Sequence, residues 1–135
     1  MATMGCYVGI DIGAVSATAA LLGDCETSIG DGDLHPLDGS RTDGRRVYLT
    51  PYTRTRGKPI AAATALLERI IAAVGADNVA GLCLTGSGSK LVARELGAAV
   101  VSDFKAIAAG FAELGLEVRT VFEMGGETSK YLRLS

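Results

Sequence analysis

Two acidic residues, Asp11 and Glu123, each stand at the end of an apolar run and close to a glycine turn. Residues 9–16 read GIDIGAVS, and residues 122–131 read FEMGGETSKY. A single offset aligns the two stretches and superposes three pairs of residues: Asp11 on Glu123, Gly13 on Gly125, and Ser16 on Thr128. Apolar residues resume after each turn, so both stretches predict a strand, a glycine turn and a returning strand. The repeat indicates two copies of one hairpin unit.

These residue types in this order can bind a nucleotide phosphate. A glycine turn exposes consecutive backbone N–H groups with no side chain in the way, which makes a concave anion site. The carboxylate at the strand end repels phosphate, but it can hold Mg²⁺ through water, and Mg²⁺ bridges phosphate oxygens. Two such hairpins facing each other would hold a triphosphate from both sides. One Asp-x-Gly segment alone is also typical of an ordinary turn, so the interpretation depends on the repeat.

The two stretches resemble the phosphate motifs of the actin-like ATPase superfamily, which includes sugar kinases, heat-shock 70 proteins and actin. They are more similar to the ATPase activators of 2-hydroxyacyl-CoA dehydratases and benzoyl-CoA reductases (the BadF/BadG/BcrA/BcrD group). In that group the first motif reads like Gly-Ile-Asp-Ile-Gly-Ser and the second like Glu-Ile-Gly-Gly-Gln-Asp-Ser-Lys. The resemblance spans most of the chain, with its specific residues near the two ends, and it implies binding of ATP and Mg²⁺.

The resemblance also implies roles for individual residues. Asp11 and Glu123 would hold Mg²⁺ and its water. Contacts to the nucleotide would come from both turns: Gly13, Ala14, Ser16, Gly125, Gly126 and Thr128. Three acidic residues would be catalytic: Asp11, Asp103 and Glu127. Glu127 stands where the activators have Gln, and it would orient the attacking water.

Asp103 has two interpretations. In the superfamily an acidic residue begins the helix that connects the two domains, and Ser102-Asp103 followed by small residues is similar to that segment. A carboxylate at a helix N-terminus can also simply cap the helix, and this is the interpretation that we favour for Asp103. Relative to the family pattern, Thr18 replaces Lys, Glu127 replaces Gln and Thr128 replaces Asp. These changes favour a slow or altered ATPase.

The leading interpretation is the N-terminal part of an Mg-ATP-binding ATPase that energises electron transfer to a CoA-thioester dehydratase or reductase partner. Whether the chain is an enzyme is left open, because the chain alone is expected to be inactive. Two alternatives remain: a non-catalytic nucleotide-sensing or assembly module of the same fold, and a small-molecule kinase of the superfamily. An iron–sulfur cluster is expected only in a longer parent chain, and a homodimer is left open.

The elements predict an α/β domain with a mixed sheet and the order βββαβαβα followed by a β-hairpin. The resemblance implies that this domain is ribonuclease-H-like. Residues 5–12 are apolar at nearly every position, as expected for a central strand covered on both faces. Residues 1–116 would form the first half of an actin-like ATPase, and residues 117–135 the opening hairpin of a truncated second half. The other elements are expected as strands at 16–22, 46–53, 79–85, 98–101, 118–124 and 128–134, and as helices at 59–74, 89–96 and 103–114.

Three stretches have a more local interpretation. Helical spacing predicts that one face of helix 59–74 is buried, with Ile60, Leu67, Ile70, Ile71 and Val74. Residues 86–90 read GSGSK, which fails both standard phosphate-loop patterns and predicts a structural tight turn. The family resemblance would place this turn at the mouth of the cleft. Residues 23–46 predict a long loop, whose arginines 41, 45 and 46 are expected to be solvated.

Composition narrows the class of protein. The chain has 135 residues, 48% of them hydrophobic and 5% aromatic, and a formal net charge of -2. The low fraction of aromatic residues and the slightly negative net charge argue against nucleic-acid and membrane partners. No apolar run approaches the roughly 18 residues that cross a bilayer, and no signal peptide is expected. The scattered cysteines at positions 6, 25 and 83 favour free thiols in a reducing cytoplasm.

Overall fold

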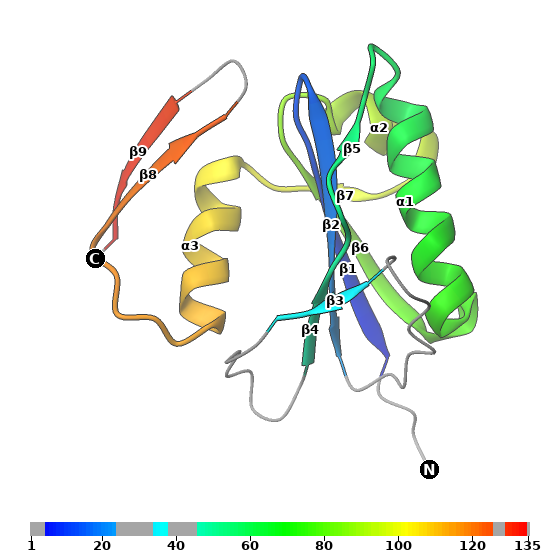
Figure 1. Cartoon of the computed structure of the whole chain (residues 1–135), viewed down its shortest axis with the longest axis horizontal. Helices are drawn as coiled ribbons and strands as arrows, with labels where there is room; N and C mark the ends of the chain where they lie inside the picture. Colours follow the sequence, from blue (N-terminus) through cyan, green and yellow to red (C-terminus); the bar gives the residue numbers. More distant parts are fainter. Residues whose placement is uncertain (1–4, 24–33, 38–45, 126–128, 135) are drawn as a thin grey trace.

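The computed structural model describes residues 5–23, 34–37, 46–125 and 129–134. They form an α/β fold with a seven-stranded mixed sheet and a separate two-stranded sheet (Figure 1). Helices α1 (Pro59–Val74) and α2 (Ser89–Leu96) cover one side of the large sheet, while α3 (Asp103–Glu113) stands on the other side (Figure 1). The predicted fold class is therefore confirmed.

Strand β1 (Cys6–Ile12) is the centre of the large sheet. It pairs antiparallel with β2 (Ser16–Gly23) and parallel with β6 (Val79–Thr85), and the order across the sheet is β3-β4-β2-β1-β6-β7. Burial alternates along β1 because strand side chains point to opposite faces of a sheet. The predicted cover on both faces is wrong, since Tyr7 is 53% exposed.

The strand predicted over residues 46–53 is two strands, β4 (Arg46–Leu49) and β5 (Thr53–Arg54), which both pair with β2. Pro51 stands between them and has no N–H to donate to a ladder. Thr50 continues the contact in another way, because its buried Oγ1 accepts a hydrogen bond from a β2 amide at 2.9 Å. The proline therefore divides the strand without separating this segment from the sheet.

Two short strands complete the large sheet. Strand β7 (Ala99–Val100) pairs with β6, within the predicted strand 98–101. Strand β3 (His35–Pro36) pairs with β4 and falls in the stretch that was predicted to be loop. Most of that stretch, with Arg41 and Arg45, lies outside the described residues.

Helix α1 covers the large sheet with a stripe rich in alanine. It begins with Pro59 in its first turn, where the missing N–H has no cost, and it ends at Gly75. The buried residues are Ala62, Ala63, Leu66, Ile70 and Val74. Ile70 and Val74 were predicted, but the other three members of the predicted face, Ile60, Leu67 and Ile71, are only partly buried. The buried stripe is thus displaced from the predicted one towards small side chains, which allow the helix to approach the sheet closely.

The other two helices differ in how they pack. Helix α2 has the predicted bounds and ends at Gly97, which is left-handed with φ 65°. Helix α3 is capped by Ser102, whose side chain accepts a hydrogen bond from the N–H of Lys105 at 3.2 Å. No residue of α3 is fully buried. Helix α3 therefore lies outside the main core.

The small sheet consists of β8 (Thr120–Met124) and β9 (Ser129–Arg133), which pair antiparallel. It stands beyond α3, away from the large sheet (Figure 1). Within the described residues the hydrophobic core is built from elements between β1 and α2. Leu132 is buried at 7% exposure but does not belong to that core. The hairpin is thus a peripheral unit next to a well-packed domain.

The states of two cysteines test the prediction of free thiols. Cys6 is disulfide-bonded, so the prediction of a free thiol is wrong for this residue, whereas Cys83 is a free thiol in β6.

Across the part of the chain that the structure describes, no helix combines the length and the apolar character that crossing a membrane requires.

Candidate functional site

A cleft of about 420 Å³ opens where the carboxyl ends of β1 and β6 meet the β8–β9 hairpin. Parallel neighbouring strands end at the same edge of a sheet, so their terminal residues converge there. The described residues that line the cleft are Asp11, Gly13, Ala14, Val15, Ser16, Thr18, Tyr52, Gly86, Ser87, Asp103, Glu123, Met124, Gly125 and Lys130. The two hairpins that the repeat identified thus meet at one cavity.

The turn between β1 and β2 forms the first wall. Its ends are joined by a hydrogen bond from the Gly13 N–H to the Ser16 carbonyl, at 2.9 Å. Thr55, which follows β5, holds the turn from behind: its N–H donates to the Val15 carbonyl at 2.9 Å and its Oγ1 donates to the Ala14 carbonyl at 3.0 Å. Because Thr55 is buried, this support is shielded from water.

This bonding decides which amides of the turn can meet an anion. The Gly13 N–H is already donated to Ser16, so it is not available to a ligand. Among the described residues, the N–H groups of Ala14 and Val15 have no such backbone acceptor, and both residues are exposed to the cleft. The amides that could meet a phosphate are therefore one residue further along the turn than the glycine suggested.

Asp11 and Thr18 face each other across the β1–β2 ladder at the base of the cleft. Burial raises the pKa of Asp11, and repulsion from Asp103 and Glu123 adds to this, while Lys130 opposes it. The Thr18 Oγ1 is buried and has no hydrogen-bond partner within the described chain. A partly desolvated carboxylate beside an unsatisfied hydroxyl provides the oxygen atoms that a hydrated cation would use.

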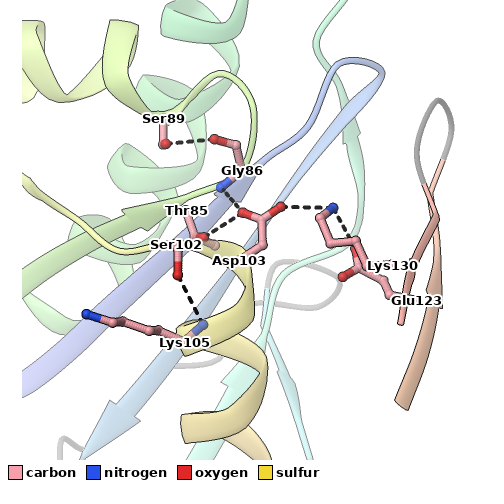
Figure 2. Close-up of polar contacts among 8 residues, drawn as sticks. All are labelled: Thr85, Gly86, Ser89, Ser102, Asp103, Lys105, Glu123 and Lys130. Atoms are coloured by element: carbon pink, nitrogen blue, oxygen red, sulfur yellow. Dashed lines mark hydrogen bonds and ion pairs between the residues drawn. The ribbon is translucent and has the colours of Figure 1, made fainter. Parts of the chain in front are cut away.

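Asp103 holds the floor of the cleft together (Figure 2). Its Oδ1 accepts hydrogen bonds from the Thr85 hydroxyl at 2.9 Å and the Gly86 N–H at 2.8 Å, and its Oδ2 lies 2.9 Å from the Lys130 Nζ. Desolvation raises the pKa of Asp103, but the hydrogen bonds from Lys130, Thr85 and Gly86 outweigh it and leave the pKa below its usual value. Asp103 therefore anchors the β6–α2 loop. The interpretation of Asp103 as the cap of α3 is wrong, because Ser102 caps that helix.

Residues 86–88 form a tight turn, as predicted, and the last two residues of the predicted segment, Ser89 and Lys90, begin α2. Gly86 has φ +99°, and a Cβ at this position would meet the Asp11 Oδ1 at 2.7 Å, so only glycine fits. The Ser89 hydroxyl donates to the Gly86 carbonyl at 2.7 Å, and the Gly88 N–H donates to the Ile12 carbonyl at 2.9 Å. The turn packs against the end of β1 and also lines the cleft through Ser87.

The β8–β9 hairpin forms the second wall. Glu123 and Lys130 are partners in the ladder, and their charged atoms lie 4.0 Å apart. The hydrogen bond to Asp103 raises the pKa of Lys130, with smaller contributions from Glu123 and Asp11. This ammonium is thus placed among three carboxylates.

The residues present fit a cation that is held partly by phosphate. Within the described chain no three His, Cys, Asp or Glu side chains lie together as a complete metal site. Mg²⁺ does not require one, because it is usually held by one or two carboxylates, phosphate oxygens and waters. Asp11 and Glu123 lie on opposite walls of the cleft, and the unsatisfied Thr18 hydroxyl belongs to the β2 residue opposite Asp11. This arrangement matches that pattern.

The structure brings together most of the residues singled out in the sequence, but not all. Three of them, Gly126, Glu127 and Thr128, lie outside the described residues. Four lining or supporting residues were missed or given no role: Val15, Tyr52, Thr55 and Lys130. Lys130 belongs to the second motif and could have been identified there. Thr55 gives no sequence signal, because its role depends on β5 pairing with β2.

Comparisons with known proteins support the fold through structure alone. No protein-family model matches the chain. No curated protein sequence matches it significantly. The (R)-2-hydroxyglutaryl-CoA dehydratase component A of Acidaminococcus fermentans is similar in structure, with a TM-score of 0.63 and 16% identity over 97% of this chain. A PPX-GPPA enzyme of Aquifex aeolicus matches with a TM-score of 0.41 and 17% identity over 96% of this chain.

The chain covers 43% of the dehydratase component and 48% of the Aquifex enzyme. It therefore spans less than half of the length of either structure. At this level of identity the likeness concerns the fold alone, and it shows that the chain shares the α/β fold of the dehydratase component.

Proposed function

We propose that this chain binds Mg-ATP in the cleft between the β1–β2 and β8–β9 hairpins, as the N-terminal part of an ATPase. The proposal rests on one observation above all. Two copies of a strand, carboxylate and glycine turn lie far apart in the sequence, and their residues Asp11, Gly13, Glu123 and Gly125 line the same cavity. A common cavity is what two half-sites for one polyphosphate require.

The proposed residue roles combine the geometry of the described walls with the two sequence motifs. Asp11 and Glu123 would hold Mg²⁺ through its waters, and the ion would neutralise phosphate charge when bound. The free amides of Ala14 and Val15, with the Ser16 hydroxyl, would donate to phosphate oxygens on the first wall. By their place in the second motif, Gly125, Gly126 and Thr128 would also donate to phosphate, and Glu127 would orient water for hydrolysis.

The finer proposal concerns the whole protein. Residues 1–116 would be the first half of an actin-like ATPase, and residues 117–135 the opening of a second half. The longer protein would use ATP to drive electron transfer to a partner that reduces or dehydrates a CoA thioester. What supports this is the structural likeness to a dehydratase component, together with the second motif. An iron–sulfur cluster would belong to the longer chain.

A second function is favoured by the state of Asp103. Both of its carboxylate oxygens are engaged, and its pKa lies below the usual value, so it is a poor proton acceptor as it stands. A module that binds nucleotide without turnover needs no base. The two functions differ in phosphate release: a binding module shows nucleotide affinity with no release of phosphate, whether alone or in the longer protein.

Calorimetric titration of Mg-ATP into the chain and into Asp11→Asn tests the central proposal. A charge-assisted contact contributes about 1.5–3 kcal/mol, so the variant should bind roughly 10- to 100-fold more weakly. Asp77→Asn, an exposed site on the turn after α1, is the matched control and should bind like the natural chain. EDTA should abolish the tight binding. Equal affinity of Asp11→Asn and Asp77→Asn would refute the role of Asp11 in the cleft.

A further inference from the structure

We propose that Lys130 is the ligand-responsive contact of the cleft: without nucleotide it ties β9 to Asp103, and a bound phosphate group takes over its ammonium. This inference rests on the proposed function. It adds Lys130 as a residue that binds the phosphate, and Asp103 as the group that competes with phosphate for Lys130. It follows from how the hairpin is attached, from the geometry of the ion pair, and from what Asp103 does when it is released.

Within the described chain, the β8–β9 hairpin contributes one buried apolar side chain, Leu132, and no residue to the main core. The main core includes no residue of α3, β8 or β9. Several large side chains of the hairpin are open to solvent, with Phe122 67% and Met124 82% exposed. The 2.9 Å contact between Lys130 and Asp103 is therefore a principal polar link across the cleft (Figure 2).

The link is of a kind that a ligand can break. The side chains of Lys130 and Asp103 keep 20% and 27% of their surface exposed, and ion pairs with this access to water contribute little to stability. A lysine ammonium is a compact charge on a flexible stem, with three donors that can turn to a new acceptor. Phosphate is such an acceptor, and it makes strong charge-assisted hydrogen bonds with lysine.

The position of Lys130 also suits the ligand. It lines the same cavity as Asp11 and Gly125, and it is the cation that stands among the acidic residues of the described lining. Three carboxylates there, from Asp11, Asp103 and Glu123, would repel a polyphosphate. One ammonium that is already held on the cavity wall offsets this repulsion without moving far.

Exchange of partners would change Asp103. Its Oδ1 would keep the hydrogen bonds from Thr85 and Gly86, which hold the carboxylate in place. Its Oδ2 would lose the ammonium and face the cleft with a free lone pair. With the ammonium gone, the Oδ2 of Asp103 would be more open to a hydrogen bond from a water in the cleft.

Affinity measurements on four variants test the competition. Lys130→Met should weaken Mg-ATP binding about tenfold, and Lys130→Arg should restore most of it. Asp103→Asn should tighten binding several-fold, because it removes the competitor for Lys130. Lys105→Met, which removes a charge from the exposed face of α3, should bind like the natural chain. Thermal melts of each variant establish that it is folded.

The double variant Asp103→Asn/Lys130→Met separates competition from general charge effects. The gain from Asp103→Asn should disappear in the Lys130→Met background, since no ammonium remains to be released. If the gain persists there, relief of repulsion explains it and the proposed exchange is wrong. If Lys130→Met binds as tightly as the natural chain, this inference fails while the proposed function stands. If the natural chain does not bind Mg-ATP, both fail.

Discussion

At the scale of single residues, the placement of Asp11 in the cleft lowers the folding stability of the ligand-free protein. The carboxylate is partly desolvated and lies near Asp103 and Glu123, and these effects raise its pKa. A group with a raised pKa in the folded state disfavours folding whenever it is ionised. The same placement makes Asp11 suitable for a cation, because a bound cation would remove the repulsion. The raised pKa of Asp11 therefore agrees with the cation site proposed above.

Replacing Asp11 by Asn should raise the melting temperature of the ligand-free chain at neutral pH. The cost of Asp11 is fully present above its folded-state pKa. It declines as the pH falls from there towards the ordinary value for aspartate, and it is absent below that value, where both states are protonated. The stabilisation by Asp11→Asn should accordingly disappear in acid. Melts of both proteins across this pH range measure the difference.

Asp77→Asn is the control, because Asp77 is exposed and surface substitutions usually change stability little. A lower melting temperature for Asp11→Asn at neutral pH would contradict the account of Asp11. So would a gain in stability that does not depend on pH.

Sequence reasoning reached some of these residues and not others, for physical reasons. Asp11 and Glu123 could be predicted because each follows an apolar run in the sequence, which places the carboxylate near the end of a strand. The free amide of Val15 could not, because it depends on Gly13 donating to Ser16 within the turn. The partnership of Asp103 with Lys130 depends on tertiary packing, which local helix-capping rules do not describe.

At the scale of elements, the first phosphate turn depends on a neighbour that is distant in sequence. Thr55 lies beyond β4 and β5, yet it donates to two successive carbonyls of the turn, at Ala14 and Val15. Because both carbonyls are hydrogen-bonded to Thr55, the orientation of these peptide units in the turn is fixed. The turn is thus ordered before any ligand arrives, which reduces the entropy that binding must overcome.

Thr55→Val should loosen this turn while keeping the shape of the side chain. Loss of one buried hydrogen bond should lower the free energy of unfolding by about 1 kcal/mol. Affinity for Mg-ATP should also fall several-fold, since the amides of Ala14 and Val15 become less ordered. Denaturant titration and calorimetry measure the two effects.

Thr53→Val, in the adjacent strand β5, provides the comparison, because Thr53 is only partly buried. The account of the turn is wrong if Thr55→Val and Thr53→Val have the same affinity for Mg-ATP.

Elements with strong local signals were predicted well. Helix α2 has its predicted bounds because Gly97 adopts a left-handed conformation that ends it. The segment 46–53 was predicted as one strand because both parts have strand-like composition, and the Thr50 side chain that joins them to β2 left no pattern in the sequence. The buried stripe of α1 was partly missed because Ala62 and Ala63 pack against the sheet, whereas larger residues were expected there.

At the scale of the whole molecule, the described chain is asymmetric. One face of the large sheet is covered by α1 and α2, and the core lies there. On the other side stand α3 and the β8–β9 hairpin, outside the core (Figure 1). The cleft lies between these parts, so one wall belongs to the packed domain and the other lies outside its core. The exchange of partners proposed for Lys130 would act at the wall outside the core.

The most direct test of the central claim is an NMR titration of the ¹⁵N-labelled chain with Mg²⁺ and a non-hydrolysable ATP analogue. The account predicts that amide signals of Ala14, Val15, Gly86 and Gly125 shift together, that EDTA reverses the shifts, and that Gly75 at the end of α1 stays unchanged. Shifts confined to other surfaces, or no shifts at millimolar nucleotide, would contradict the claim that this cleft binds Mg-ATP.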